Sequence, residues 1–332
     1  MTQPDDFGFN EEAALLKDSA HKFFAQHFTA DVLHGLVAED PTPDKAPLVQ
    51  WDETMWQQMV DLGWTVLAVP ESAGGLGMPL VAVAGLVEEL GRAAFPCPLL
   101  GTLNATYALA ACGAEGEAAL ADIAAGLAAS LAITNREGSW AGGNTDVVAA
   151  DGKLNGTAWF VQDARKVDRL LVAAQSAAGL SLYWVATDAS GVSIKPDAIV
   201  DLTRDQAHIQ FDNVEAQEVS NSGLAVLHQA MPAIWTMLAA DIVGAAEWQL
   251  QTTVEYVSTR QQFEHPLGFF QAVKHPLVDV MLQIDESKSL VYTAACAIDC
   301  EPEKAVQYAH MAKASASETC LLYTSPSPRD HG

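Results

Sequence analysis

The chain has 332 residues, with 17 Lys or Arg against 42 Asp or Glu, which gives a formal net charge of −25. Half of the residues are hydrophobic and 18% are charged, a globular composition that excludes a collagen-like or wholly disordered chain. The negative surplus repels nucleic-acid phosphates and anionic membranes, so we expect no nucleic-acid partner and no membrane insertion. The five scattered cysteines and an acidic N-terminus without a signal-peptide core predict a cytoplasmic protein.

Residues 6–128 predict a helical N-terminal domain. Asn10 is a candidate N-cap, with Glu11 and Glu12 in the first turn of the helix that follows. A second helix over residues 51–62 is expected to end at Gly63, and a third runs from Pro79 to Gly91. The apolar positions of the first helix recur at helical spacing, namely Leu15, Leu16, Ala20, Phe23, Phe24 and Phe28.

The hydrophobic period changes from helical to two in residues 129–218. Seven short β-rich stretches follow one another there, separated by Gly, Asp, Asn or Pro, and they predict a central antiparallel β-domain. Long helical patterns return over residues 223–320 and predict a C-terminal helical bundle. The fold class is therefore α+β and multi-domain, with a helical domain, a β-domain and a helical bundle in that order.

The last residues, 321–332, break the helical pattern with a Ser-Pro-Ser-Pro run. Proline cannot continue a helix, so we interpret this segment as a non-native or disordered tail. We therefore expect a chain that is truncated at its C-terminus, with an incomplete bundle.

No sequence signature of nucleotide hydrolysis, Rossmann binding, zinc binding or acyl-serine chemistry is present. Cys296 and Cys300 are four apart without further ligands at metal spacing, so we predict core packing and no metal site. The segment 260–275 concentrates the cations Arg260, Lys274 and two histidines in an otherwise acidic chain. Arg260 either contacts a phosphate or satisfies the carbonyl end of its own helix.

Three segments resemble the acyl-CoA dehydrogenase family. VPESAGGLGMPLVAVAGLVEELGRAAFPCPLLGT is similar to its N-terminal helical domain, and LNGTAWFVQDARKVDRLLVAA to its central β-domain. TRQQFEHPLGFFQAVKH resembles the family's Arg-x-x-Phe-Gly-x-Pro-(x)n-Gln hallmark. The resemblance runs in the right order from about residue 6 to residue 320.

The resemblance implies FAD as the cofactor and assigns residues to it. Arg260 and Gln271 match the hallmark residues that reach the FAD of a neighbouring subunit, and Phe263 is expected against the adenosine half. Phe160 and Gln162 match positions at the flavin ring, although alternate strand positions such as Phe160 are also normal core positions. Thr134 matches the first residue of the family's flavin-binding and substrate-binding loop.

Two departures from the family pattern concern the cofactor. The rest of the loop after Thr134 does not match, and Glu264 stands where the family has glycine, which places an anion near the expected pyrophosphate. The first departure weakens the assignment of this loop to the flavin, and the second predicts reduced affinity for FAD.

The catalytic base is not identified by the resemblance. The usual glutamate lies near the C-terminus and has no counterpart here, and the alternative position on the first bundle helix is Ile234, which cannot accept a proton. Asp241 is the one weak candidate. Its sequence neighbours are apolar, and burial among them would raise its pKa toward a value suited to proton transfer. Glu247 is interpreted as a solvated or capping helix residue. Because the bundle is incomplete and the usual base is missing, we expect this truncated chain to have no dehydrogenase activity of its own.

The function implied is FAD-dependent α,β-dehydrogenation of an acyl-CoA thioester to the enoyl-CoA, in fatty acid or sterol side-chain degradation. The expected partners are an acyl-CoA substrate, an electron-accepting flavoprotein or other acceptor, and further subunits of a homo- or hetero-oligomer. The alternative is a non-catalytic partner subunit of a heteromeric acyl-CoA dehydrogenase, and a third possibility is a helical interaction protein without flavin.

Overall fold

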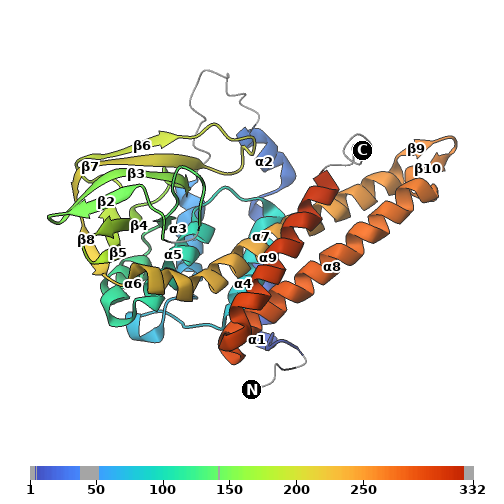
Figure 1. Cartoon of the computed structure of the whole chain (residues 1–332). Coiled ribbons are helices and arrows are strands. Elements are labelled where there is room, and N and C mark those ends of the chain that lie inside the picture. The colour runs from blue at the N-terminus through green and yellow to red at the C-terminus, as the bar shows by residue number, and fades with distance from the viewer. Residues whose placement is uncertain (1–3, 5, 38–51, 141–142, 325–332) are drawn as a thin grey trace. The chain divides into compact units, whose positions relative to one another are not determined.

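The computed structural model describes residues 4, 6–37, 52–140 and 143–324 (Figure 1). Trp51, where one predicted helix begins, and residues 325–332 of the predicted tail lie outside this range. The chain forms two compact units, a helical unit built from Met1–Ala30, Pro79–Phe95 and Pro232–Gly332, and a sheet unit built from Asp31–Met78 and Pro96–Met231. Each unit is therefore assembled from segments that are distant in the sequence.

The helical unit begins with α1 (Glu11–His27), which starts where the sequence predicts it. The Asn10 side chain accepts a hydrogen bond of 2.9 Å from the Ala13 N–H, so one of the free donors of the first turn is satisfied. Ala20 and Phe24 are buried as expected, but Leu15 is 65% exposed, because the buried face of the helix is narrower than its apolar pattern suggests.

Helix α4 (Leu80–Ala93) packs against α1 and starts after Pro79, which has no side chain capable of capping it. The Asp299 carboxylate, from the end of α8 (Gln271–Cys300), accepts a hydrogen bond of 3.2 Å from the Leu80 N–H. A cap for this helix is thus supplied from more than 200 residues away in the sequence.

The helices α8 and α9 (Pro302–Thr324) lie side by side (Figure 1). Their contact uses small residues, and one buried stripe on α9 consists of Ala305, Ala309, Ala312 and Ala316. At its centre the Ser287 hydroxyl lies 2.8 Å from the Ser315 hydroxyl and 2.9 Å from the Thr319 hydroxyl. Small side chains let the two helices approach closely, and these three hydroxyls satisfy one another.

The long helix α7 (Gly223–Thr259) enters the helical unit at Pro232 and meets α4 at two glycines. A Cβ at Gly91 would overlap the Asp241 carbonyl oxygen, and a Cβ at Gly244 would overlap the Glu88 carbonyl oxygen. Backbone therefore contacts backbone at this crossing, which only glycine permits.

The sheet unit carries α3 (Glu53–Asp61), α5 (Leu99–Ala111), α6 (Glu117–Ala124) and the short 3₁₀ segments η1 (Trp64–Val66), η2 (Glu71–Ala73) and η3 (Gly113–Gly116). Helix α2 (Ala30–Val37) belongs to this unit from Asp31 onward. Met55, Trp56 and Met59 are buried on one face of α3, and Gly63 has a φ of 77°, as predicted for a left-handed helix end.

The sheet contains eight strands within the described residues, in the order β6-β7-β3-β2-β4-β5-β8, with β1 also paired to β4. Most pairs are antiparallel, but β1 and β2 each pair with β4 in parallel, so a purely antiparallel domain is not observed. The bounds of the strands are β1 (Ala129–Ala132), β2 (Val147–Ala150), β3 (Lys153–Gln162), β4 (Arg169–Ser176), β5 (Gly179–Ala186), β6 (Val192–Pro196), β7 (Gln206–Glu215) and β8 (Gln217–Ser220).

The observed order of a helical region, a central sheet and long C-terminal helices confirms the predicted α+β architecture. Helix α9 continues to Thr324, past the boundary predicted at residue 320. The domain limits themselves stay a prediction. Within the described part of the chain α7 alone is long and apolar enough to cross a membrane, and 67% of its apolar window is buried in the protein, as in a core helix.

Candidate functional site

Arg260 follows directly after α7, at the junction that the sequence singled out. Its backbone is fixed on both sides, because its N–H donates to the Tyr256 carbonyl at 2.8 Å and its own carbonyl accepts from the Leu267 N–H at 2.8 Å. Its guanidinium is exposed and makes no hydrogen bond or ion pair with any residue that the structure describes. The cation is therefore not used by the end of its own helix within the described chain and is available to a ligand.

A two-residue turn lies between Arg260 and α8. It joins β9 (Gln261–Gln262) to β10 (His265–Pro266), and its two residues, Phe263 and Glu264, have φ values of 52° and 64°. Two positive φ angles in a two-residue hairpin loop are typical of a type I′ turn, which favours Asn and Gly. Glu264 thus stands where the local backbone favours glycine, which is the residue expected from the family pattern.

Phe263 projects from this turn with 85% of its surface exposed, while its ring edge contacts Phe270 at a centroid distance of 6.2 Å. A short 3₁₀ segment, η4 (Leu267–Phe269), leads to Gln271, the first residue of α8, whose exposed side chain makes no hydrogen bond within the described residues. The hairpin and η4 therefore bring Arg260, Phe263 and Gln271 together at one end of the helical unit.

The sheet unit brings together the other three predicted cofactor residues. The Trp159 N–H donates to the Thr134 carbonyl at 3.0 Å, and the Ser130 hydroxyl donates to the Gln162 carbonyl at 2.6 Å. The register of β3 shifts between Ala158 and Val161, and Phe160 within this bulge has a φ of 54°. The bulge leaves the Phe160 ring 37% exposed, so the ring is not a normal core residue.

A cleft of about 510 Å³ lies beside these residues, formed by the loop before β2 and by Gln175 of β4. The Arg136 guanidinium in this loop lies 5.7 Å from the centre of the Trp159 ring, and the Arg136 N–H donates to Asp146. Trp159 also stacks on His208, at a centroid distance of 5.2 Å. Neither Arg136 nor Trp159 is predicted from the sequence, although an arginine in the loop that differs from the family pattern and a tryptophan next to Phe160 are signals that indicate them.

The residues considered for the catalytic base lie on α7. Asp241 is only half-buried, and Ile234 is completely buried. Glu247 is not the solvated residue that the sequence suggested, because its side chain is 17% exposed and pairs with Lys288 at 2.6 Å and with Arg92. Arg92 lies on α4 and Lys288 on α8, so the hydrophobic pattern of α7 by itself could not predict either ion pair.

Glu247 belongs to a buried charge network that connects four helices. At its centre Glu88, with a side chain 2% exposed, pairs with Lys17 at 2.6 Å and Lys288 at 2.8 Å and accepts a hydrogen bond of 2.8 Å from the Tyr292 hydroxyl. Burial by itself would raise the pKa of Glu88, but the two lysines together hold that pKa below its ordinary value. Burial acts to lower the pKa of Lys288, but the carboxylates of Glu88 and Glu247 outweigh it and raise that pKa. Burial and the charge of Glu88 both raise the pKa of Tyr292.

Cys296 and Cys300 have their sulfurs 3.8 Å apart, and burial raises the pKa of Cys296 to about 12. Cys296 is buried and Cys300 half-buried. Across the described residues, no group of three or more His, Cys, Asp or Glu side chains has metal-ligand geometry.

Two family models match the chain. The acyl-CoA dehydrogenase N-terminal domain matches residues 10–126, and the acyl-CoA dehydrogenase C-terminal domain matches residues 221–324. Acyl-CoA dehydrogenase IpdE2 of Mycobacterium tuberculosis is 30% identical over 86% of this chain and 76% of its own length. The IpdE2 protein of Mycolicibacterium smegmatis is 26% identical over 97% of this chain and 87% of its own length.

Solved structures of similar proteins share the fold of this chain. A chain of the "Tcur3481-Tcur3483 steroid ACAD G363A variant" is 30% identical, with a TM-score of 0.82 over 94% of this chain and 84% of that chain. A chain of the ChsE4-ChsE5 complex from Mycobacterium tuberculosis shares the fold at 24% identity, with a TM-score of 0.81 over 97% of this chain and 88% of that chain.

Proposed function

The chain belongs to the acyl-CoA dehydrogenase family, and from this premise we propose that it serves the FAD-dependent α,β-dehydrogenation of an acyl-CoA thioester. The proposal assigns Arg260, Phe263 and Gln271 to the FAD of a neighbouring subunit. It assigns Thr134, Phe160 and Gln162 to a flavin ring.

The observation that carries this proposal is the unpaired cation at the helix junction. The chain has a net charge of −25, yet Arg260 is exposed without a partner among the described residues and shares its junction with an exposed aromatic ring. A planar guanidinium suits phosphate oxygens, and an exposed aromatic ring suits a nucleotide base. This combination fits the diphosphate and adenosine parts of FAD.

The sheet unit offers groups suited to the ring end of the same cofactor. Phe160 presents an exposed aromatic ring two residues before Gln162, the last residue of β3, and the bulge that exposes Phe160 is a feature often found next to active sites. When bound, the flavin supplies the hydride acceptor for the β-hydrogen of the substrate. The protein residues orient the cofactor and the thioester and exclude water between them.

A general base has to take the α-proton, which the thioester carbonyl acidifies. Asp241 is the proposed candidate on this chain, and Ile234 cannot fill this role. Asp241→Asn keeps the shape of the side chain and removes its basicity. Turnover of acyl-CoA substrates by the unsubstituted chain would contradict the inactivity expected from the sequence, and Asp241→Asn should then lower the reduction of an electron acceptor by at least about 100-fold, in line with the usual contribution of a general base. Unchanged turnover would exclude Asp241.

The relatives supply the proposed substrate class and assembly. One similar structure is described as a steroid acyl-CoA dehydrogenase with two named components. We propose a bulky steroid-type or fatty acyl-CoA as substrate, a cytoplasmic location, an electron-transferring flavoprotein or similar acceptor, and an oligomer in which one subunit completes the FAD site of another.

A second candidate function, a non-catalytic partner subunit, is favoured by two specific observations. Glu264 places a carboxylate in the turn beside Arg260, and a buried isoleucine occupies one of the family's two positions for the base. In this role Arg260 would still serve the cofactor of another chain, but Asp241→Asn would leave the activity of the assembly unchanged.

The experiment that tests the main proposal measures FAD content and assembly together. Arg260→Ala should lower FAD retention by at least about tenfold without changing the unfolding temperature, because a lost charged hydrogen bond costs about 1.5–3 kcal/mol. Arg260→Lys should restore part of the affinity, because it keeps the charge but not the bidentate geometry. Lys274→Ala, which removes an exposed cation from the same segment, is the matched control. Unchanged FAD content in an assembled Arg260→Ala protein would contradict the assignment.

A further inference from the structure

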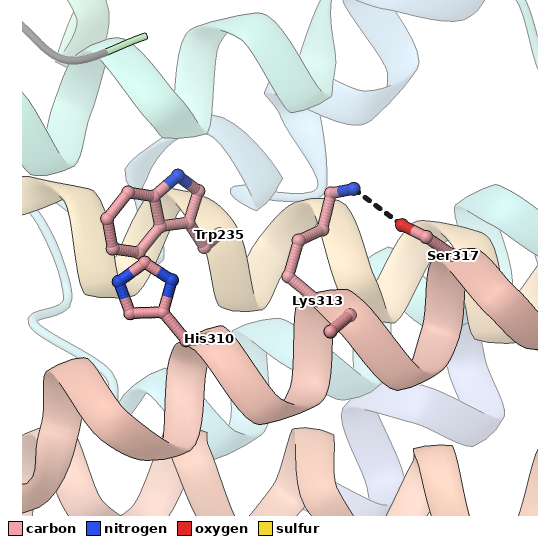
Figure 2. A pocket seen from close by; sticks show the side chains of 5 residues that line it. Trp235, His310, Lys313 and Ser317 are labelled. Atoms are coloured by element: carbon pink, nitrogen blue, oxygen red, sulfur yellow. Dashed lines mark hydrogen bonds between the residues drawn. The ribbon is translucent and has the colours of Figure 1, made fainter.

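A cavity of about 310 Å³ opens between α7 and α9 in the helical unit (Figure 2). Trp235 of α7 lines it from one side, and α9 contributes His310, Lys313, Ala314 and Ser317. These α9 residues follow an i, i+3, i+4, i+7 pattern and therefore share one helix face. None of the residues assigned to the cofactor lines this cavity.

Lys313 has an unusual environment for a lysine of this protein. Its ammonium group donates a hydrogen bond of 2.7 Å to the neutral Ser317 hydroxyl (Figure 2), and no carboxylate of the described chain lies within ion-pair distance. By contrast, five other lysines pair with carboxylates within the described residues, namely Lys17, Lys22, Lys166, Lys288 and Lys304. Lys313 is therefore a half-buried amine without a counter-charge.

The cavity wall beside Lys313 is aromatic. The Trp235 and His310 rings contact each other at a centroid distance of 4.3 Å, and Lys313 lines the same cavity with its nitrogen turned toward Ser317 (Figure 2). An indole ring is a large apolar surface on which a short hydrocarbon chain can pack. A group attached to the Lys313 nitrogen would therefore find apolar surface within the cavity.

Two lysines on the same helix differ in reactivity for a physical reason. Burial lowers the pKa of Lys313, whereas the hydrogen bond and charge of Glu301 raise the pKa of Lys304. Only the neutral amine has the lone pair that attacks a carbonyl carbon, so at any pH below both pKa values Lys313 has the larger reactive fraction.

We propose that Lys313 is a site of N-acylation by short-chain acyl-CoA thioesters. The neutral Lys313 nitrogen attacks the thioester carbonyl, the carbon–sulfur bond breaks, and an amide forms. Coenzyme A leaves as the thiolate and takes up the proton that the nitrogen loses, so no oxidant or reductant is needed. The amide product is uncharged and lies against Trp235, which removes the cost of holding an unpaired ammonium group in a half-buried place.

The test compares lysines within one native protein. The full chain is incubated with acetyl-CoA, samples are quenched over time, and the acetylated fraction of each lysine is measured by mass spectrometry after digestion. We expect the initial rate at Lys313 to exceed that at Lys304 by roughly threefold for each unit that separates their pKa values, because the gain in neutral amine outweighs the loss of intrinsic nucleophilicity. Lys274, exposed and without a partner among the described residues, is the second internal reference.

A parallel reaction in concentrated urea separates the effect of the fold from that of the local sequence. The preference for Lys313 should disappear there, because the cavity no longer exists. Equal rates at Lys313 and Lys304 in the native protein, or a preference that persists in urea, would overturn the proposal. FAD content measured on the same samples reports on the proposed function separately, since the acylation does not require bound flavin.

Discussion

Gly244 of α7 lies directly against the backbone carbonyl of Glu88 in α4, so that a Cβ at position 244 would overlap the carbonyl oxygen. This contact sets the spacing of the two helices and brings the side chains of Glu88 and Glu247 toward the same lysine, Lys288. The close backbone contact at Gly244 therefore helps to place the carboxylates of the buried charge network.

The first prediction concerns this crossing. Gly244→Ala should lower the free energy of unfolding by about 3 kcal/mol or more, because backbone cannot move aside as a flexible side chain would. Gly35→Ala is the matched control, since Gly35 lies in the exposed helix α2 and a Cβ there meets nothing within 4 Å. The control should be neutral or slightly stabilising, by up to about 1 kcal/mol. Urea unfolding curves measure both, and equal effects of the two substitutions would contradict the packing argument.

The second prediction concerns Glu88. Glu88→Gln should cost about 3–5 kcal/mol of unfolding free energy, because it leaves Lys17 and Lys288 without their buried counter-charge. Glu286→Gln, at an exposed carboxylate of α8 without a partner within the described chain, should change the unfolding free energy by less than about 0.5 kcal/mol.

The pH dependence provides an independent check on Glu88. Its pKa is lowered in the folded protein, so its contribution is fully present above the unfolded carboxyl pKa of about 4.3 and is lost as the pH falls through the lowered folded value. The stability of the unmodified protein should therefore fall more steeply with acidification below about pH 4 than that of Glu88→Gln. Parallel acid profiles for the two proteins would show that the ion pairs do not stabilise the fold.

The third prediction separates backbone from charge at Glu264. Its φ of 64° lies in the left-handed region, so Glu264→Gly should stabilise the hairpin by about 1 kcal/mol, whereas Glu264→Ala should not. Both substitutions remove the anion beside Arg260 and should increase FAD retention in the assembled protein. Unfolding temperature and FAD content are measured on the same samples. Higher FAD retention in the glycine variant alone would assign the effect to the turn, and no change in either variant would exclude an unfavourable role of Glu264.

The sequence by itself determined the local elements, because their signals lie within a few residues of each other. Asn10 with the acidic first turn of α1, Gly63 after α3, and the change to period two near residue 129 each correspond to an observed feature. The resemblance to the family hallmark around Arg260 could likewise be recognised from the sequence, because the residues that carry it are close together in the chain.

Only the tertiary structure decided how distant segments meet. The partners of Glu247 come from α4 and α8, the cap of α4 comes from Asp299, and the parallel pairing of β1 and β2 with β4 joins strands separated by others in the sequence. The amphipathic period of a helix specifies which face is buried but not which charge will lie opposite. A burial pattern therefore predicted Glu247 as solvated, whereas packing placed it between Arg92 and Lys288, where opposite charges compensate for the loss of water.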